Sequence, residues 1–241
     1  IHFTTFGGDF GPGMFYSRRI GRALGADEVN VPENGRIEDL PQQTTILGAA
    51  KLTGRISRGL SIGMLQAITS EERAVVTDSS GHNSEGMLEP FAHYNIIRLK
   101  QDLFDNSSVG MIVTSVAKDS RAPAFTNGYD WSLKIDNNTY LLDGFLALSH
   151  RTDSRGDRRT GAAGKMAYSK IAGEHWLWSV SSDFTSPNYN INDAGFFFSP
   201  DDFGGVASVN YKEDVPSLIV RNFNTGLFLH ARQNFEGANL V

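Results

Sequence analysis

The chain of 241 residues contains no cysteine, and this absence excludes several classes of protein. A disulfide framework, a thiolate metal site and a cysteine nucleophile all require that residue. The fold must therefore be held together by packing, hydrogen bonds and ion pairs.

Long apolar runs and an excess of positive charge are also missing. No stretch of about 18 apolar residues occurs, which excludes a membrane-spanning helix. The formal net charge is −5, and residues of both signs are scattered along the chain. Without a basic stripe, nucleic acid is not an expected partner.

What the sequence does contain is a period of two. In residues 130–136 the apolar side chains of Trp131, Leu133 and Ile135 alternate with polar ones. Successive side chains of a strand point to opposite faces of a sheet, so this pattern predicts a strand with one apolar and one polar face. The pattern recurs along most of the chain, and no helix of useful length is predicted.

The alternation predicts an all-β, antiparallel fold with about twelve strands, bounded by clusters of Gly, Pro, Asn and Asp. We expect a single domain over residues 1–241. The extended segments are Met14–Ile20, Thr44–Thr53, Ile56–Thr69, His93–Phe104, Ser107–Lys118, Tyr129–Asp136, Thr139–Arg151, Ala162–Ile171, His175–Phe184, Gly195–Phe198, Val206–Lys212 and Leu218–Phe235, the last of which has room for two strands.

The connections between these segments are of two kinds. Tight turns are expected at Asp105–Asn106, Asn137–Asn138 and Ala172–Glu174, and long polar connections at Gly21–Gln43, Ser70–Pro90, Thr152–Thr160 and Ser186–Ala194. Short turns at one end and long loops at the other are typical of transmembrane β-barrels. A β-sandwich with unequal loops produces the same alternation, so the pattern alone leaves both folds open.

Three observations favour a barrel whose apolar faces meet lipid. Aromatic residues lie near segment ends, as in the belts at membrane interfaces. Small residues such as Gly59, Ser61 and Gly63 alternate with apolar ones, which suits a curved sheet. Full charges occupy the polar face in mid-strand. The candidates for the lipid-facing side are Ile97, Leu99, Trp131, Leu133, Ile135, Trp176, Trp178, Leu227 and Leu229.

The polar face would then line a lumen. Charged lumen walls select a passing solute or hold a plug. Alternatively, the charges pair across strands and only stabilise the barrel. Both interpretations stay open for the lumen-facing candidates, which are Arg98, Lys100, Asp102, Lys134, Asp136, Lys212, His230 and Arg232.

Several segments also resemble an uncharacterised family of bacterial outer-membrane β-barrels that usually follow a carbohydrate-binding family 9-like module. The segments that carry this resemblance are Phe15–Arg22, Ile46–Arg55, Gly59–Gly63, Asn106–Gly110 and Asn192–Phe196. The resemblance implies a transmembrane barrel in a Gram-negative outer membrane, with membrane lipid and a carbohydrate-binding module or lipoprotein as partners. It implies no catalytic residue.

The sequence departs from that family at both ends. The binding module is absent before Ile1. The chain ends at Val241 without the terminal aromatic residue that the barrel-assembly machinery usually recognises. We therefore expect this chain to be part of a longer polypeptide.

Five motifs offer other chemistry. Gly59–Gly63 matches the nucleophile elbow of serine hydrolases, but no helix is expected after it. Glu85 and Glu89 suggest a glycosidase acid and base. The charged loop Arg151–Arg159 could contact lipid phosphate or simply be solvated. Calcium ligands could come from loop carboxylates, and none of the histidines has the spacing of a zinc site. The loop carboxylates are Asp153, Asp157, Asp201 and Asp202. The histidines are His2, His82, His93, His150, His175 and His230.

From these observations we expect a non-catalytic outer-membrane barrel without cofactor or metal. Its expected work is the passage, docking or anchoring of extracellular ligands, among which glycans are suggested by the companion module alone. The alternative is a secreted carbohydrate-active β-protein or hydrolase with its site in the long loops.

Overall fold

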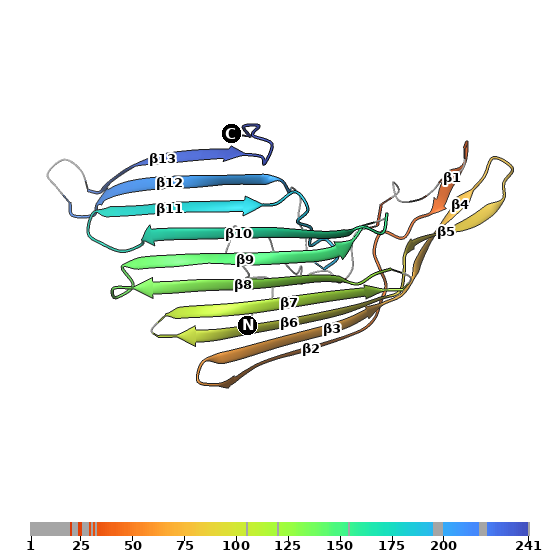
Figure 1. The fold of residues 1–241 in the computed structure, drawn as a ribbon, viewed down its shortest axis with the longest axis horizontal. Coiled ribbons are helices and arrows are strands. Elements are labelled where there is room, and N and C mark those ends of the chain that lie inside the picture. The colour runs from red at the N-terminus through yellow and green to blue at the C-terminus, as the bar shows by residue number, and fades with distance from the viewer. Residues whose placement is uncertain are drawn as a thin grey trace.

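The computed structural model describes residues 20, 24–25, 29, 31, 33–104, 106–119, 121–153, 155–194, 200–216 and 221–240. These residues form thirteen strands in two antiparallel sheets (Figure 1). The predicted all-β antiparallel fold is therefore confirmed. Within the same ranges, no helix is long and apolar enough to cross a bilayer.

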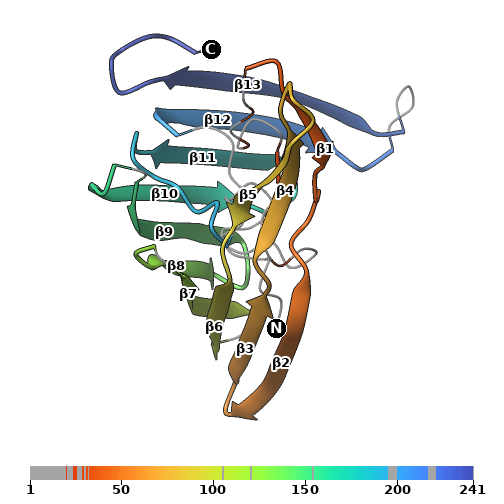
Figure 2. The ribbon, with the colours of Figure 1, turned by 90° about the vertical axis from the view of Figure 1, so that its right-hand side faces the viewer.

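Ten strands form the larger sheet, in the order β13-β12-β11-β10-β9-β8-β7-β6-β3-β2. The sheet is strongly twisted and its strands follow an arc (Figure 2). Strands β2 and β13 are its two edges, so the described pairings make an open curved sheet rather than the closed barrel expected. Its strands are β2 (Ile46–Ser57), β3 (Leu60–Thr69), β6 (Ala92–Leu103), β7 (Ser107–Lys118), β8 (Ala124–Ile135), β9 (Tyr140–Thr152), β10 (Arg158–Lys170), β11 (Trp176–Thr185), β12 (Asp202–Glu213) and β13 (Phe223–Gln233).

The smaller sheet was missed by the sequence analysis. It consists of β1 (Arg36–Asp39), β4 (Glu72–Thr77) and β5 (Asn83–Glu89), in the order β1-β4-β5. These strands lie within two connections that were expected to be long polar loops. Their apolar content is low because their core is small: Leu24, Ala74 and Leu88 are buried together, with Val29 and Leu40 packed against them.

Other boundaries also differ from expectation. The segment Ile56–Thr69 is divided by a turn at Arg58 and Gly59, where φ is 39° and 84°. Leu218–Phe235 contains one strand, β13, and β8 begins earlier than expected, at Ala124. Of the expected first strand only Ile20 is described, in a bend, and Gly195–Phe198 lies outside the described residues.

The two kinds of connection are sorted to opposite ends of the sheet, as predicted. The turns between β6 and β7, β8 and β9, and β10 and β11 lie at one end (Figure 1). Asn137 and Asn138 adopt φ of 51° and 65°, the left-handed conformation that tight hairpins favour. The smaller sheet and residues 186–194 of the β11–β12 connection lie at the other end, which we call the loop end (Figure 1). There the connection between β9 and β10 is shorter than expected, because the strands extend to Thr152 and from Arg158.

The pairing registers define two faces of the large sheet. One face bears a buried apolar cluster that includes Tyr94, Ile96 and Phe145, and Tyr189 and Ile191 of the β11–β12 connection pack onto it. We call this the inner face and the opposite one the outer face. At the loop end, the inner face is therefore the protein's main core.

The predicted division of side chains follows these faces. Seven of the expected lumen residues share the inner face in register, and Asp136 lies in the β8–β9 turn. The nine expected lipid-facing residues share the outer face.

Candidate functional site

A buried ion pair of the inner face joins β6 to β8. Arg98 donates from Nη1 and Nη2 to the two carboxylate oxygens of Asp130, at 2.6 and 2.7 Å. The Arg98 side chain is 2% exposed and that of Asp130 is 20% exposed. A bidentate pair of this kind holds both side chains in one orientation, so it connects three adjacent strands rigidly.

A glycine makes room for this pair. Gly110 of β7 lies between Lys100 and Asp130 in the pairing register. A Cβ atom at position 110 would lie 2.4 Å from Arg98 Nη1 and 2.4 Å from Asp130 Oδ1. Any larger residue at position 110 would displace the two charged groups, which explains a glycine in the interior of a strand.

Further pairs neutralise much of the remaining charge on the inner face. Arg232 of β13 contacts Asp183 at 2.6 Å and also Asp202. Asp102 pairs with Arg55, and Lys212 with Asp214 at 2.6 Å. Four of the eight expected lumen residues therefore have oppositely charged partners. This arrangement favours the interpretation of the charges as a stabilising ladder.

The loop end of the inner face is covered by the β11–β12 connection. Tyr189 and Ile191 are 1% and 2% exposed, and Asn190 N donates to Ser149 Oγ at 3.0 Å. The backbone of this connection passes so close to β10 that a Cβ atom at Gly161 would lie 2.2 Å from Tyr189 N. Residues 186–194 thus form a covering segment that fills this part of the interior.

A buried charged cluster connects this covering segment to the two sheets. Lys118 Nζ at the end of β7 lies 2.9 Å from Glu89 Oε1 of β5 and 3.0 Å from Asp193 Oδ1 of the covering segment. The side chains of Lys118 and Glu89 are 8% and 0% exposed. One ammonium group thus holds three segments that are far apart in the sequence.

A cavity of about 690 Å³ opens beside this cluster at the loop end. Its wall includes Lys118, Arg121, Arg151, Asp153 and Asp193. Five of the ten residues that line it are charged, so the cavity is suited to a polar ligand rather than an apolar one.

Asp153 on the cavity wall is held by protein donors. Arg159 Nε donates to Asp153 Oδ2 at 2.9 Å, and the backbone N–H groups of Arg155 and Asp157 donate to Asp153 Oδ1. The hydrogen bond from Arg159 is the main reason that the pKa of Asp153 lies below its ordinary value. The carboxylate therefore stays ionised and paired with Arg159 at neutral pH.

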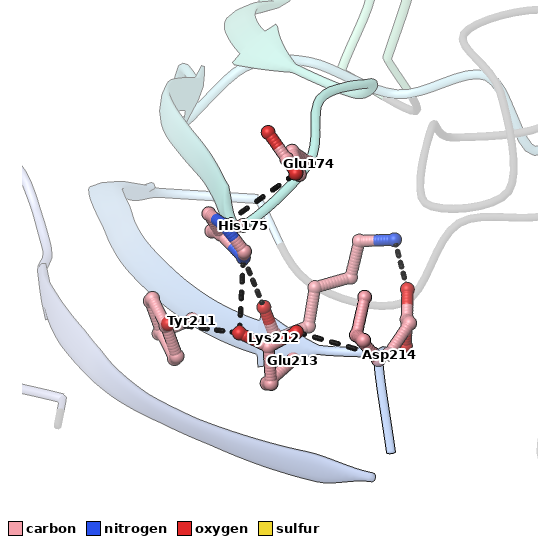
Figure 3. A network of polar contacts seen from close by, with 7 residues as sticks. Glu174, His175, Tyr211, Lys212, Glu213 and Asp214 are labelled. Atoms are coloured by element: carbon pink, nitrogen blue, oxygen red, sulfur yellow. Dashed lines mark hydrogen bonds and ion pairs between the residues drawn. The ribbon is translucent and has the colours of Figure 1, made fainter. Parts of the chain in front are cut away.

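A second polar network lies at the short-turn end, between β11 and β12 (Figure 3). His175 Nδ1 lies 3.2 Å from the carbonyl oxygen of Lys212 and 3.6 Å from Glu213 Oε2, and Tyr211 donates to Glu213 at 3.4 Å. The rings of His175 and Tyr211 stack with centroids 5.5 Å apart. Because its contacts join the residue before β11 to the end of β12, we interpret the network as a clasp between these two strands.

The alternative catalytic motifs are not assembled in the part of the chain that the structure describes. Ser61 follows a turn and lies within β3, so the strand-to-helix context of a nucleophile elbow is absent there. Glu85 and Glu89 are four residues apart on β5, roughly 13 Å at about 3.3 Å per residue, beyond the spacing of a glycosidase pair. Glu89 instead pairs with Lys118.

Among the described residues no group of three potential metal ligands is close enough to hold an ion. Asp201 accepts a hydrogen bond from Phe235 N, and Asp202 pairs with Arg232. His82 lies next to the β4–β5 turn, and the ring of His93 contacts the ring of Phe91. His2 lies outside the described residues.

Sequence reasoning missed Asp130, Asp183, Asp193 and Lys118 as partners in these clusters. For Asp130 a signal was available, since it shares the polar parity of Lys134 on the same strand. No signal could pair Lys118 with Glu89, because their contact depends on how the smaller sheet meets the larger one.

The model of a family of unknown function, DUF5916, matches residues 10–240 of the chain. The chain belongs to the DUF5916 family. No curated protein and no solved structure matches it. The assignment agrees with the expected resemblance only in that the family is of unknown function, and it carries no information on a membrane location or a carbohydrate-binding module.

Proposed function

We propose that this DUF5916 domain forms the wall of a β-barrel in a bacterial outer membrane, and that it docks an extracellular ligand at its loop end without catalysing a reaction. The observation that carries the proposal is the apolar outer face. Large apolar side chains between 37% and 59% exposed extend across eight consecutive strands: Ile97, Val109, Phe125, Tyr129, Ile135, Leu146, Leu148, Met166, Tyr168, Trp176, Val180, Val209, Phe223, Leu227 and Leu229.

Water is a poor solvent for such a face. Soluble monomers rarely expose a contiguous apolar patch larger than a few hundred Å². In a bilayer the apolar side chains of this face would contact lipid hydrocarbon, while the charges of the inner face stay away from it. The alternation of the sequence thus has a direct physical reason in a bilayer.

The strands also have a suitable length. Those of the large sheet contain 10 to 13 residues. Twelve residues at about 3.3 Å span roughly 40 Å, which becomes roughly 28 Å at a tilt of about 45°. This matches an outer-membrane apolar band, which is about 25 Å tall.

Aromatic residues of the outer face gather where a membrane interface is expected. At the short-turn end, Tyr168 lies 5.9 Å from Tyr140 and 5.2 Å from Trp178 between ring centroids, and Trp176 lies 5.0 Å from Tyr211. Amphipathic rings prefer the headgroup level of a bilayer. This cluster supports a belt beside the short turns.

The contents of the inner face support docking more than open passage. The covering segment fills the loop end, and ion pairs connect the neighbouring strands. In a bilayer the backbone groups of the edge strands β2 and β13 must also find partners, because lipid supplies none. The proposal therefore includes closure of the sheet by further strand pairing.

An arginine placed on the outer face tests this proposal. Leu146 lies mid-strand on β9 and is 44% exposed. In lipid we expect Leu146→Arg to cost about 2–4 kcal/mol of folding free energy, because the charge enters hydrocarbon. In water an exposed surface substitution changes stability by only about 0.5 kcal/mol. The measurement is urea unfolding in phospholipid vesicles.

His150→Arg is the matched control, because His150 lies on the same strand and face near the loop end. We expect it to cost no more than about 1 kcal/mol, as near an interface. Native membranes should also retain the protein through high salt and alkaline washes. Equal effects of the two variants, together with release by the washes, would support a secreted carbohydrate-active β-protein instead.

A further inference from the structure

The cavity at the loop end has more positive groups than its acidic groups can neutralise. Lys118 is engaged by Glu89 and Asp193, and Asp153 is engaged by Arg159. Each acidic side chain on the wall thus already has a cationic partner. The two remaining cations on the wall are Arg121 and Arg151.

Arg151 is the unusual member of this pair. It lies at the end of β9 directly opposite Arg159 in the pairing register, so a second cation is its cross-strand neighbour. The Nε atom of Arg151 is buried, and this atom has no hydrogen-bond partner within the described part of the chain. Arg121 is exposed at the rim, where its guanidinium has no carboxylate partner among the described residues.

An anion in the cavity would supply the missing acceptor for Arg151 Nε. Burying a polar donor without a partner costs about 1–3 kcal/mol, and more when the donor is charged. An oxyanion could accept a forked pair of hydrogen bonds from Arg151 and a further one from Arg121. Arg159 is already engaged, because its Nε and Nη2 donate to Asp153 and Asp157.

We propose that this cavity is a binding site for a small organic oxyanion, a molecule that carries a carboxylate or phosphate group. The anionic group contacts Arg151 in the interior and Arg121 at the rim, and the rest of the molecule fills the cavity. Its volume of about 690 Å³ falls within the range of about 300–1,000 Å³ typical of small-molecule sites.

This inference names the ligand class of the docking site proposed above, and it depends on that function only for its location at the barrel's loop end. Binding in detergent solution does not require that lipid covers the outer face. The test of ligand binding and the test of membrane insertion therefore have independent outcomes.

The test is isothermal titration calorimetry of the full chain in a non-ionic detergent at low salt. The probes are glucuronate and glucose 6-phosphate, with glucose as the neutral molecule of similar size and inorganic phosphate as the free anion. We expect both charged sugars to bind and glucose not to bind. The affinity should fall as sodium chloride is added, because salt screens the contact.

Variants locate the binding. Arg151→Gln and Arg121→Gln should each weaken the affinity about 10-fold or more, as expected for loss of a charge-assisted hydrogen bond. Arg155→Gln is the matched control, because Arg155 is exposed on the same turn and does not line the cavity. The rim position of Arg121 keeps that variant informative if Arg151→Gln fails to fold.

The outcomes separate the two proposals. Binding of a charged sugar that either cavity variant weakens supports the site, whatever the result of the Leu146→Arg experiment. Phosphate binding with the same dependence on Arg151 also supports it and identifies the anionic group recognised. Failure of every charged probe to bind, or binding that both cavity variants leave unchanged, overturns the inference.

Discussion

Replacing Asp130 by alanine is expected to destabilise the protein by about 3–5 kcal/mol. The substitution removes the carboxylate that accepts hydrogen bonds from both terminal nitrogens of Arg98, whose side chain is 2% exposed. A buried cation that loses its partner keeps its desolvation cost and forfeits the attraction that offset it. The expected result is a lower urea midpoint in detergent or lipid, measured by tryptophan fluorescence.

The control is Asp102→Ala, on the same inner face. Asp102 pairs with Arg55, but their side chains are 42% and 65% exposed, so the loss should not exceed about 1 kcal/mol. The double variant Arg98→Met with Asp130→Ala should recover part of the stability, because it removes the stranded charge. If Asp130→Ala and Asp102→Ala cost the same, the Arg98–Asp130 pair is not the buried link that we describe.

Much of the sheet could be predicted from residue order alone. The parity of Trp131, Leu133 and Ile135 against Ser132 and Lys134 is local information, and it suffices to assign side chains to two faces. The asparagine turn at residues 137–138 is equally local, since it depends on which residues tolerate positive φ. Strand existence, face and turn position were therefore accessible.

The remaining features depend on contacts between distant segments. Alternation cannot distinguish an open sheet from a closed barrel, because closure is decided at the edges β2 and β13. The smaller sheet escaped detection because only a few residues, such as Ala74 and Leu88, form its core. A short strand with so little apolar periodicity looks like a polar loop.

The candidate site was partly visible in the sequence. The density of charges marks the loop Arg151–Arg159, but composition alone does not distinguish the roles of its arginines. The structure divides them: Arg159 pairs with Asp153, whereas Arg151 lines the cavity. That division follows from register, which places Arg151 and Arg159 opposite each other, and the register of a hairpin depends on its exact loop length.

Replacing Gly161 by valine should detach the covering segment from the sheet. A Cβ atom at this position would lie 2.2 Å from Tyr189 N and 2.3 Å from Tyr189 Cα, and backbone atoms cannot rotate away as a flexible side chain does. The covering segment must then move, which exposes Tyr189 and Ile191. At about 1.5–3 kcal/mol for each large apolar side chain, the expected loss is about 3–6 kcal/mol.

Limited proteolysis measures this effect directly, because a detached segment 186–194 becomes accessible to cleavage near Tyr189. The control is Gly54→Val on β2, where no atom lies within 4 Å of the added Cβ. Valine favours strands, so that variant should be neutral or slightly stabilising. A Gly161→Val protein with the protease resistance and urea midpoint of the parent chain would contradict the close packing of this segment. It would also remove the reason for interpreting the interior as filled at the loop end, and an open passage would become the better account.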